Sequence, residues 1–196
     1  MMEANKLLSN TPDKRWSCYT DEGAHAARNS LLTNEFTTTF AVTSFFADIN
    51  YSNVGRRRWL LYPNCLAMGH GSTENACAIW ASDDSGSMDT NLYKEQFVAW
   101  PPEGNLPKMM VFRYWSFSID QEIKGSTVTM TIDGEAVPIE MQPFEEGHRL
   151  STIVWEPDFS FRSITSDTMV TITVTIPNGR RYSYKVKVLN FDPIGY

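Results

Sequence analysis

The sequence contains few of the residues on which metal, redox and polyanion-binding sites depend. Its 196 residues include three histidines and three cysteines, and 17 basic residues stand against 23 acidic ones, for a formal net charge of −6. Nucleic acids are bound mainly by Lys and Arg side chains that neutralise phosphates. The one basic run, residues 56–58, is too short to reverse this balance. We therefore expect no nucleic-acid partner.

Long apolar runs are also missing. No stretch of about twenty apolar residues occurs, so we expect no transmembrane segment. Residues 1–5 lack the charged and apolar regions of a signal peptide, which indicates that a leader was removed or never existed.

The odd number of cysteines leaves the thiol chemistry open. Cys18, Cys65 and Cys77 form no Cys-x-x-Cys pair. They permit one disulfide with one remaining thiol, or three reduced thiols, and the spacing does not choose between these alternatives.

Hydrophobic residues, by contrast, make up 42% of the chain, and six tryptophans are spread along it. A chain of this length can bury a core in one large domain or two small ones. Its character changes at residues 100–104, Trp-Pro-Pro-Glu-Gly, where a mixed first part gives way to alternating apolar residues. Because Pro and Gly punctuate chains, we expect two domains, residues 1–99 and 100–196.

The first part combines helical and strand-like patterns. Residues 22–32 are rich in Ala and Leu and follow Asp21 as an N-cap candidate, which predicts a helix. Apolar residues recur at three- and four-residue steps over 36–49, which predicts a second, amphipathic helix. The short apolar runs 59–62 and 77–80 are typical of buried strands or of a short helix packed on a sheet. These patterns together predict an α+β layer for the first part.

The second part alternates apolar and polar residues at the period of a strand. Asp133-Gly134 and Asn178-Gly179 separate two pairs of such runs, which predicts two hairpins, the second with a type I′ turn. About six strands at regular spacing indicate an immunoglobulin- or fibronectin-like sandwich. The expected strands are residues 111–118, 127–132, 137–141, 151–155, 170–176 and 182–188.

An ordered set of short motifs resembles a known family. Residues 53–63, Asn-Val-Gly-Arg-Arg-Arg-Trp-Leu-Leu-Tyr-Pro, followed by Met68-Gly-His-Gly71 and Ala76-Cys-Ala-Ile-Trp80, resemble the last motif of bacterial CAP-type (SCP-like extracellular; cysteine-rich secretory, antigen 5, pathogenesis-related) domains. Similar family segments are found at residues 8–12, 16–20 and 23–24, and motifs of an accompanying β module at 97–102, 115–118, 152–157 and 191–193. The resemblance implies an α+β fold, in which a partial CAP-type α-β-α layer precedes an all-β sandwich, and an extracellular location.

The resemblance also exposes departures from the family pattern. The family's first helix would lie ahead of Met1, so the domain is expected to be N-terminally truncated, with a surface left to associate with something else. Two histidines and two acidic residues line the family's cavity, but here Asn10 and Arg56 match the histidine positions. Asp48 matches the second acid, and the residues around Asn29 offer no glutamate for the first. The metal-type cleft is therefore expected to be dismantled.

The substitution at Arg56 changes the chemistry of such a cleft. Zinc needs three or four close ligands, whereas a guanidinium is permanently positive and repels a cation. We therefore expect no metal and no cofactor. Arg56 favours either an anion, such as a carboxylate or a phosphate head group, or a salt bridge to Asp48 that plugs an inactive cleft. Both alternatives remain open at the level of sequence.

Other candidate residues give weaker signals. Glu22 and His25 lie three residues apart on the expected first helix, a spacing seen in carboxylate-histidine metal motifs, and His70 is the next histidine along the chain. A single pair of this kind is weak evidence for a metal site, so ordinary surface histidines are favoured over metal ligands. Neither a Gly-x-Ser-x-Gly elbow nor a Cys/His signature is present, so hydrolase chemistry is not indicated.

Three functional hypotheses follow. The leading one is a secreted, non-enzymatic CAP-type binding protein for an apolar ligand, such as a sterol or fatty acid, or for a protein surface, with Asn10, Asp48 and Arg56 at the cleft. The second is a metal-dependent hydrolase that uses Glu22, His25, Asp48 and His70. The third is a structural or adhesive piece of a larger surface protein.

Overall fold

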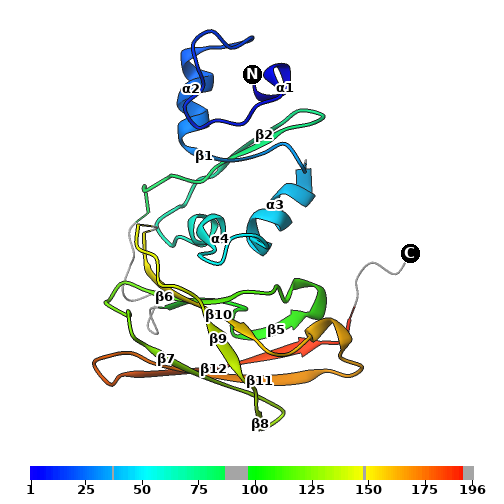
Figure 1. Cartoon of the computed structure of the whole chain (residues 1–196), viewed down its shortest axis with the longest axis vertical. Coiled ribbons are helices and arrows are strands. Elements are labelled where there is room, and N and C mark those ends of the chain that lie inside the picture. Colours follow the sequence, from blue (N-terminus) through cyan, green and yellow to red (C-terminus); the bar gives the residue numbers. More distant parts are fainter. Residues whose placement is uncertain (37, 87–96, 148, 192–196) are drawn as a thin grey trace. The chain divides into compact units, whose positions relative to one another are not determined.

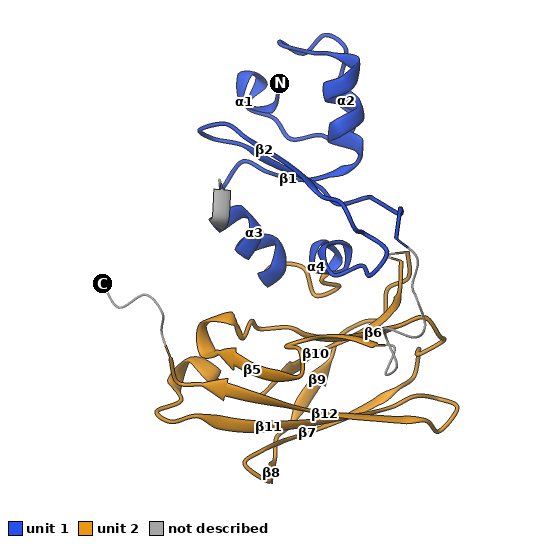
Figure 2. Ribbon diagram, turned by 180° about the vertical axis from the view of Figure 1, so that it is seen from behind, with its two compact units in different colours: residues 1–48, 55–92 blue, residues 49–54, 93–196 orange. Residues whose placement is uncertain are grey.

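The computed structural model describes residues 1–36, 38–86, 97–147 and 149–191. It divides into two compact units (Figure 2). The first comprises Met1–Asp48 and Gly55–Leu92, and the second comprises Ile49–Val54 and Tyr93–Tyr196. The domain boundary expected at residues 99–100 falls inside strand β4 (Phe97–Trp100), which pairs with strands of the second unit.

The first unit is a small antiparallel sheet with helices on both faces (Figure 1). Its strands lie in the order β1-β3-β2. Helices α1 and α2 lie on one side of the sheet, and α3 and α4 lie on the other (Figure 1). The bounds are α1 Met2–Asn5, α2 Asp21–Arg28, β1 Ser30–Thr33, α3 Thr38–Ala47, α4 Gly55–Leu60, β2 Gly69–Ser72 and β3 Cys77–Trp80.

Helix α2 is shorter than its sequence predicts. It begins after Thr20, not Asp21, because the Thr20 hydroxyl accepts a hydrogen bond from the Gly23 N–H at 2.9 Å. It ends at Arg28, and the prediction that it continues to Leu32 is wrong. Residues Ser30–Thr33 pair instead with Cys77–Trp80, so strand pairing overrides local helix propensity.

The second helix is confirmed, but α3 covers Thr38–Ala47 and not residues 36–49. It is not clearly amphipathic, because the apolar Phe40 and Val42 are exposed. Ala41 and Phe45 of α3 are fully buried against Cys77 and Ile79 of β3. Successive residues of a strand point to opposite faces, so the partly buried Ala78 and Trp80 lie on the face that α2 covers. The run 77–80 is therefore a strand between two helical layers.

The second unit contains two sheets that share one core. Their strand orders are β4-β6-β10-β9 and β5-β12-β11-β7-β8, and neighbouring strands are antiparallel except β5 and β12. The core contains Phe117 and Ile153 from the first sheet and Ile172 and Val186 from the second. The remaining bounds are β5 Gly104–Pro107, β6 Trp115–Ile119, β7 Thr127–Ile132, β8 Glu135–Ala136, β9 Ile139–Met141, β10 Ser151–Pro157, β11 Thr168–Thr175 and β12 Arg181–Leu189, with short 3-10 helices η1 Lys108–Met110 and η2 Phe161–Ser163. The described residues are thus α+β in class and mostly β.

The first expected hairpin is only partly formed. Asp133 and Gly134 both have positive φ, 50° and 97°, and join β7 to the two-residue strand β8. The chain then leaves this sheet, because Ile139–Met141 pairs with β10 in the other sheet. The expected long return strand is therefore divided between the two sheets.

The second expected hairpin is confirmed, but its turn differs from the prediction. Strands β11 and β12 pair over eight positions. A type I′ turn needs two positive φ angles, whereas Gly179 has φ 88° and Asn178 is not in that region. The Gly179 N–H donates to the Ile176 carbonyl at 2.9 Å, so the turn spans Ile176–Gly179 and only its last residue is left-handed.

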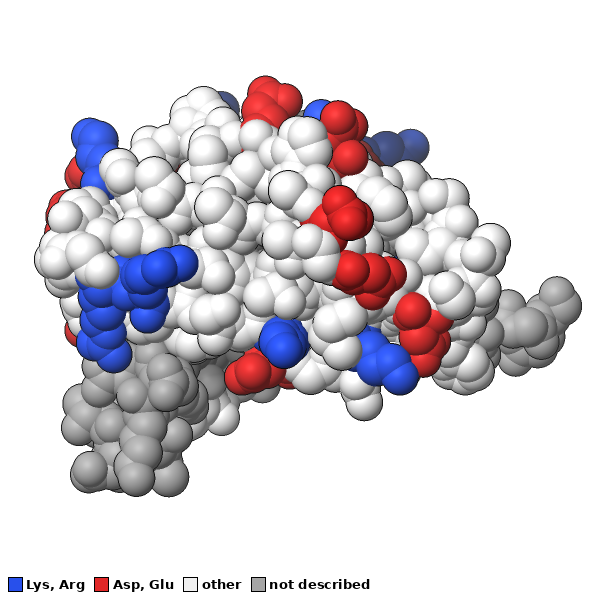
Figure 3. All heavy atoms as spheres, turned by 90° about the horizontal axis from the view of Figure 1, so that it is seen from below, with Lys and Arg blue, Asp and Glu red and all other residues white. Residues whose placement is uncertain are grey.

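Within the described ranges, no helix is long and apolar enough to cross a bilayer. On the face drawn in Figure 3, basic and acidic side chains are scattered over a mostly uncharged surface. Side chains of both signs are therefore present on that face.

The left-handed Gly179 provides a test of this turn. Gly179→Ala is expected to lower the free energy of unfolding by about 1 kcal/mol, because a Cβ disfavours positive φ. No heavy atom lies within 4 Å of the added Cβ, so the loss is conformational and not steric. Gly179→Asn should lose less, since Asn tolerates this region. Urea unfolding of the three proteins measures the difference, and equal stability of the alanine variant would contradict the turn assignment.

Candidate functional site

Two residues singled out from the sequence line the same crevice of the first unit. Asn10 and Arg56 lie in its wall, and the crevice has a volume of about 240 Å³. Leu8, Leu31 and Leu32 supply its apolar lining. A second crevice of about 230 Å³ shares Asn10, Ser30 and Leu31 with the first and adds Arg28, Trp59 and Ser82. The two crevices therefore adjoin along β1.

Asn10 is held in place by the backbone around it. Its Nδ2 donates to the Ala27 carbonyl at 2.6 Å and to the Ser30 carbonyl at 2.8 Å. These bonds tie the N-terminal segment to the last turn of α2 and the first residue of β1. An amide in this geometry acts as a structural donor, and an imidazole could not donate twice from one nitrogen.

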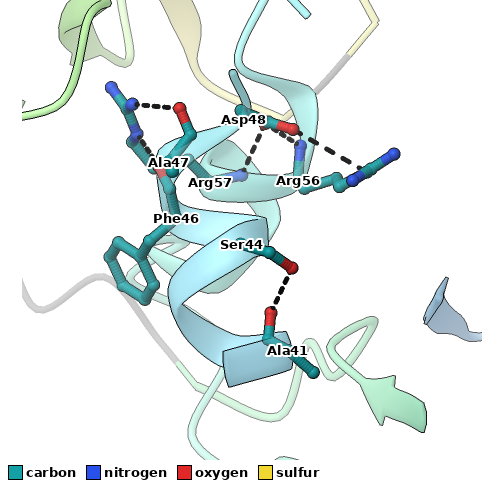
Figure 4. Close-up of polar contacts among 7 residues, drawn as sticks. All are labelled: Ala41, Ser44, Phe46, Ala47, Asp48, Arg56 and Arg57. Carbon is teal, nitrogen blue, oxygen red and sulfur yellow. Dashed lines mark hydrogen bonds and ion pairs between the residues drawn. The ribbon is translucent and has the colours of Figure 1, made fainter. Parts of the chain in front are cut away.

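Asp48 is buried at the junction between α3 and α4 (Figure 4). It follows α3 in a left-handed conformation, with φ 47°. Its Oδ2 accepts hydrogen bonds from the Arg56 N–H at 2.9 Å and the Arg57 N–H at 3.2 Å. Its Oδ1 lies 3.7 Å from the Arg56 Nε. Asp48 therefore caps the first turn of α4 and also forms the ion pair with Arg56.

Arg57 completes this junction from the other direction. Its side chain is fully buried, and its Nε donates to the Phe46 carbonyl at 2.6 Å while its Nη2 donates to the Ala47 carbonyl at 3.3 Å. These carbonyls belong to the last turn of α3, which has no intrahelical donors for them. Burial lowers the pKa of Arg57 to about 10, so the side chain is still cationic at neutral pH.

The sequence pointed to Arg56 and missed Arg57. The two arginines differ only in their position on helix α4. The buried side of this helix includes Gly55, Arg57, Arg58 and Leu60 but not Arg56. Burial of two adjacent arginines is rare enough that sequence alone would not suggest it.

Burial also affects Asp48, the acid matched to the family cavity. Loss of hydration raises the pKa of Asp48, and this effect outweighs the opposing influence of the Arg57 and Arg56 N–H donors and of their guanidiniums. Asp48 is therefore a structural acid that is harder to ionise than a surface carboxyl.

The remaining candidates are not gathered into a site. The His25 ring packs 5.2 Å from the Trp80 ring, His70 Nε2 lies 3.5 Å from the Cys77 Sγ, and Glu22 is exposed. Within the described part of the chain, no group of three His, Cys, Asp or Glu side chains could hold a metal ion. The sequence left the cysteines undecided, and in the structure Cys18, Cys65 and Cys77 are all thiols.

Comparison with protein-family models and with curated proteins found no match to this chain. The family interpretation therefore rests on the motifs of the sequence itself.

The buried fork of Arg57 generates a stability prediction. Arg57→Lys should lower the free energy of unfolding by about 2 kcal/mol or more, because an ammonium lacks the planar fork with which the guanidinium reaches two carbonyls of α3 at once. Arg15→Lys is the control, since the Arg15 side chain is 89% exposed and its replacement should change stability by less than about 0.5 kcal/mol. Denaturant unfolding of both variants gives the comparison, and equal effects would show that the Arg57 contacts contribute little.

The raised pKa of Asp48 generates a pH prediction. A carboxyl with a higher pKa in the folded state stabilises the fold fully below its unfolded pKa of about 3.9, and this contribution is lost as the pH rises through the folded pKa. Asp48→Asn keeps an oxygen acceptor but does not titrate. The stability of the wild type relative to Asp48→Asn should therefore fall as the pH is raised from about 3 towards 7. A constant or rising difference in a pH series of unfolding curves would refute the shift.

Proposed function

We propose that this chain is an extracellular, non-enzymatic binding protein of the CAP type, whose ligand is a small apolar carboxylate such as a fatty acid. The observation that carries this proposal is the shared crevice of Asn10 and Arg56, since these are the two positions that match the family's cavity histidines. The crevice keeps the location expected for a ligand site while its chemistry has changed from metal-ligating to anion-binding.

The composition of the crevice supports this class of ligand. The Arg56 side chain is 33% exposed, and its guanidinium lies over the Phe45 ring at 5.5 Å as well as near Asp48. These contacts fix its orientation, so little side-chain entropy is lost on binding a carboxylate. Leu8, Leu31 and Leu32 offer apolar surface for the first methylenes of a chain.

The size of the crevice favours a chain over a ring system. Pockets that enclose drug-sized ligands have volumes of about 300–1,000 Å³, and the crevice is smaller, at about 240 Å³. A carboxylate and the start of an alkyl chain fit this volume, whereas a sterol nucleus would project from it.

The strand order of the second unit supports the proposed immunoglobulin-like sandwich. Immunoglobulin strands are lettered along the chain, and β4 to β12 can be lettered in the same way. The first sheet, β4-β6-β10-β9, then corresponds to the order A-B-E-D. Strands β12, β11, β7 and β8 of the opposite sheet correspond to G, F, C and C′, with β5 beside β12. Immunoglobulin domains have the same order of strands in their two sheets.

A protein-binding or structural role is the second candidate, and it is favoured by helix α3. Phe40 is 72% exposed, Val42 is 38% exposed, and Phe36, just before the helix, is 44% exposed. Apolar side chains grouped on one helix are typical of association surfaces. The hydrolase hypothesis has no comparable support, because Glu22, His25 and His70 have separate surroundings.

A matched pair of ligands tests the proposal. Decanoate should bind the full chain, and Arg56→Gln should weaken it by about tenfold or more, because a charge-assisted hydrogen bond contributes about 1.5–3 kcal/mol. Methyl decanoate, which lacks the charge, should bind both proteins equally and be recovered unhydrolysed. Arg15→Gln is the control for loss of a surface cation. Calorimetric titration that finds no difference between the acid and its ester would refute the proposal.

A further inference from the structure

A large cavity lies in the second unit, and none of the candidate site residues singled out by the sequence lines it. Its volume is about 780 Å³, which is within the range of ligand-binding pockets. Its walls come from the segment that enters β6 and from the segment that joins the end of β10 to η2. All of its lining residues belong to the second unit.

One wall of this cavity is a supported aromatic surface. Phe159 is 41% exposed and meets Phe161 edge to face, with ring centroids 4.9 Å apart. Phe161 in turn packs 5.4 Å from Trp115, and both of these rings are buried. The exposed ring is therefore backed by a rigid stack, and aromatic faces backed in this way bind C–H groups through their negative quadrupole.

A second wall carries an acid and a guanidinium side by side. The Arg113 Nε donates to the Glu156 Oε1 at 2.8 Å, and the Arg113 guanidinium lies over the Tyr114 ring at 5.0 Å. No described residue forms a hydrogen bond with the Arg113 Nη atoms or with the Glu156 Oε2. Adjacent donors and acceptors of this kind suit hydroxyl groups, each of which donates and accepts.

Trp115 supports this aromatic wall from behind. It is fully buried although it borders the cavity. Its Nε1–H is not reached by solvent and has no hydrogen-bond partner among the described atoms, as is also found for the Nε1–H of Trp155. The polar contacts of the cavity are therefore left to Arg113 and Glu156.

The charged side chains around the cavity limit the chemical class of ligand that it can bind. Arg113 and Arg162 are matched by Glu156 and Asp158 around the cavity, so its lining is neutral overall. A phosphate or carboxylate ligand would need an excess of positive charge, and a purely apolar ligand would leave four charged side chains without a role. From these contacts we infer that the cavity binds a neutral oligosaccharide, with a sugar ring stacked on Phe159 and its hydroxyls bound by Arg113 and Glu156.

Titration of the full chain with defined oligosaccharides tests this inference. The probes are cellohexaose, maltohexaose, mannohexaose and the hexamer of N-acetylglucosamine, followed by calorimetry and by the fluorescence of the tryptophans. At least one should bind and change the emission, because Trp115 lines the cavity. Phe159→Ala and Glu156→Gln should each weaken that binding by about tenfold. Circular dichroism checks that both variants are folded.

The controls separate this site from other surfaces. Phe191→Ala removes a ring that is 56% exposed and does not line the cavity, so it should leave the affinity unchanged. Arg56→Gln should also leave it unchanged, which distinguishes this site from the crevice of the first unit. The inference is overturned if none of the four sugars binds, if Phe159→Ala binds as well as the wild type, or if decaproline binds in place of the sugars and is lost in Phe159→Ala.

Discussion

The reciprocal capping of helices α3 and α4 is the interaction on which the first unit depends. Arg57 donates to the final carbonyls of α3, and Asp48, just past that helix, accepts from the first amides of α4. Each helix is short, at ten and six residues, and helices of this length are marginal alone in water. Because each supplies the missing hydrogen bonds of the other, the two form together, and Phe45 and Leu60 are thereby presented to the sheet.

This junction also positions the crevice. Asp48 holds the backbone N–H and the Nε of Arg56, and the Arg56 side chain lines the crevice. The neighbouring arginines thus have different roles although their sequence context is nearly the same. Arg57 has its guanidinium buried for structure, and Arg56 keeps a third of its side chain exposed. One segment thus holds a buried arginine that joins two helices and a partly exposed arginine that lines the crevice.

The sequence predicted the elements better than their ends and partners. The β11–β12 hairpin and helix α3 follow from alternation and helical spacing, which are local signals. The strand Ser30–Thr33 could not be predicted, because only its pairing with Cys77–Trp80 makes it a strand. The transfer of Ile139–Met141 to the other sheet likewise depends on pairing with β10, a strand that comes later in the chain. At the site, the resemblance to CAP-type motifs singled out Asn10, Asp48 and Arg56, but the burial of Arg57 and the aromatic cavity depend on packing that no short motif records.

Asn10 links the crevice to the stability of the N-terminal segment. The two hydrogen bonds of its amide are what ties the chain ahead of α2 to the α2–β1 junction. Asn10 is therefore both a wall of the crevice and one attachment of this segment, beside the hydrogen bond that Asn75 Nδ2 donates to Glu3 Oε1 at 3.0 Å. Fraying of the segment removes a wall of the crevice, and an occupied crevice resists fraying. If the crevice binds a ligand as proposed, its occupancy and the protection of the first residues from proteases rise and fall together.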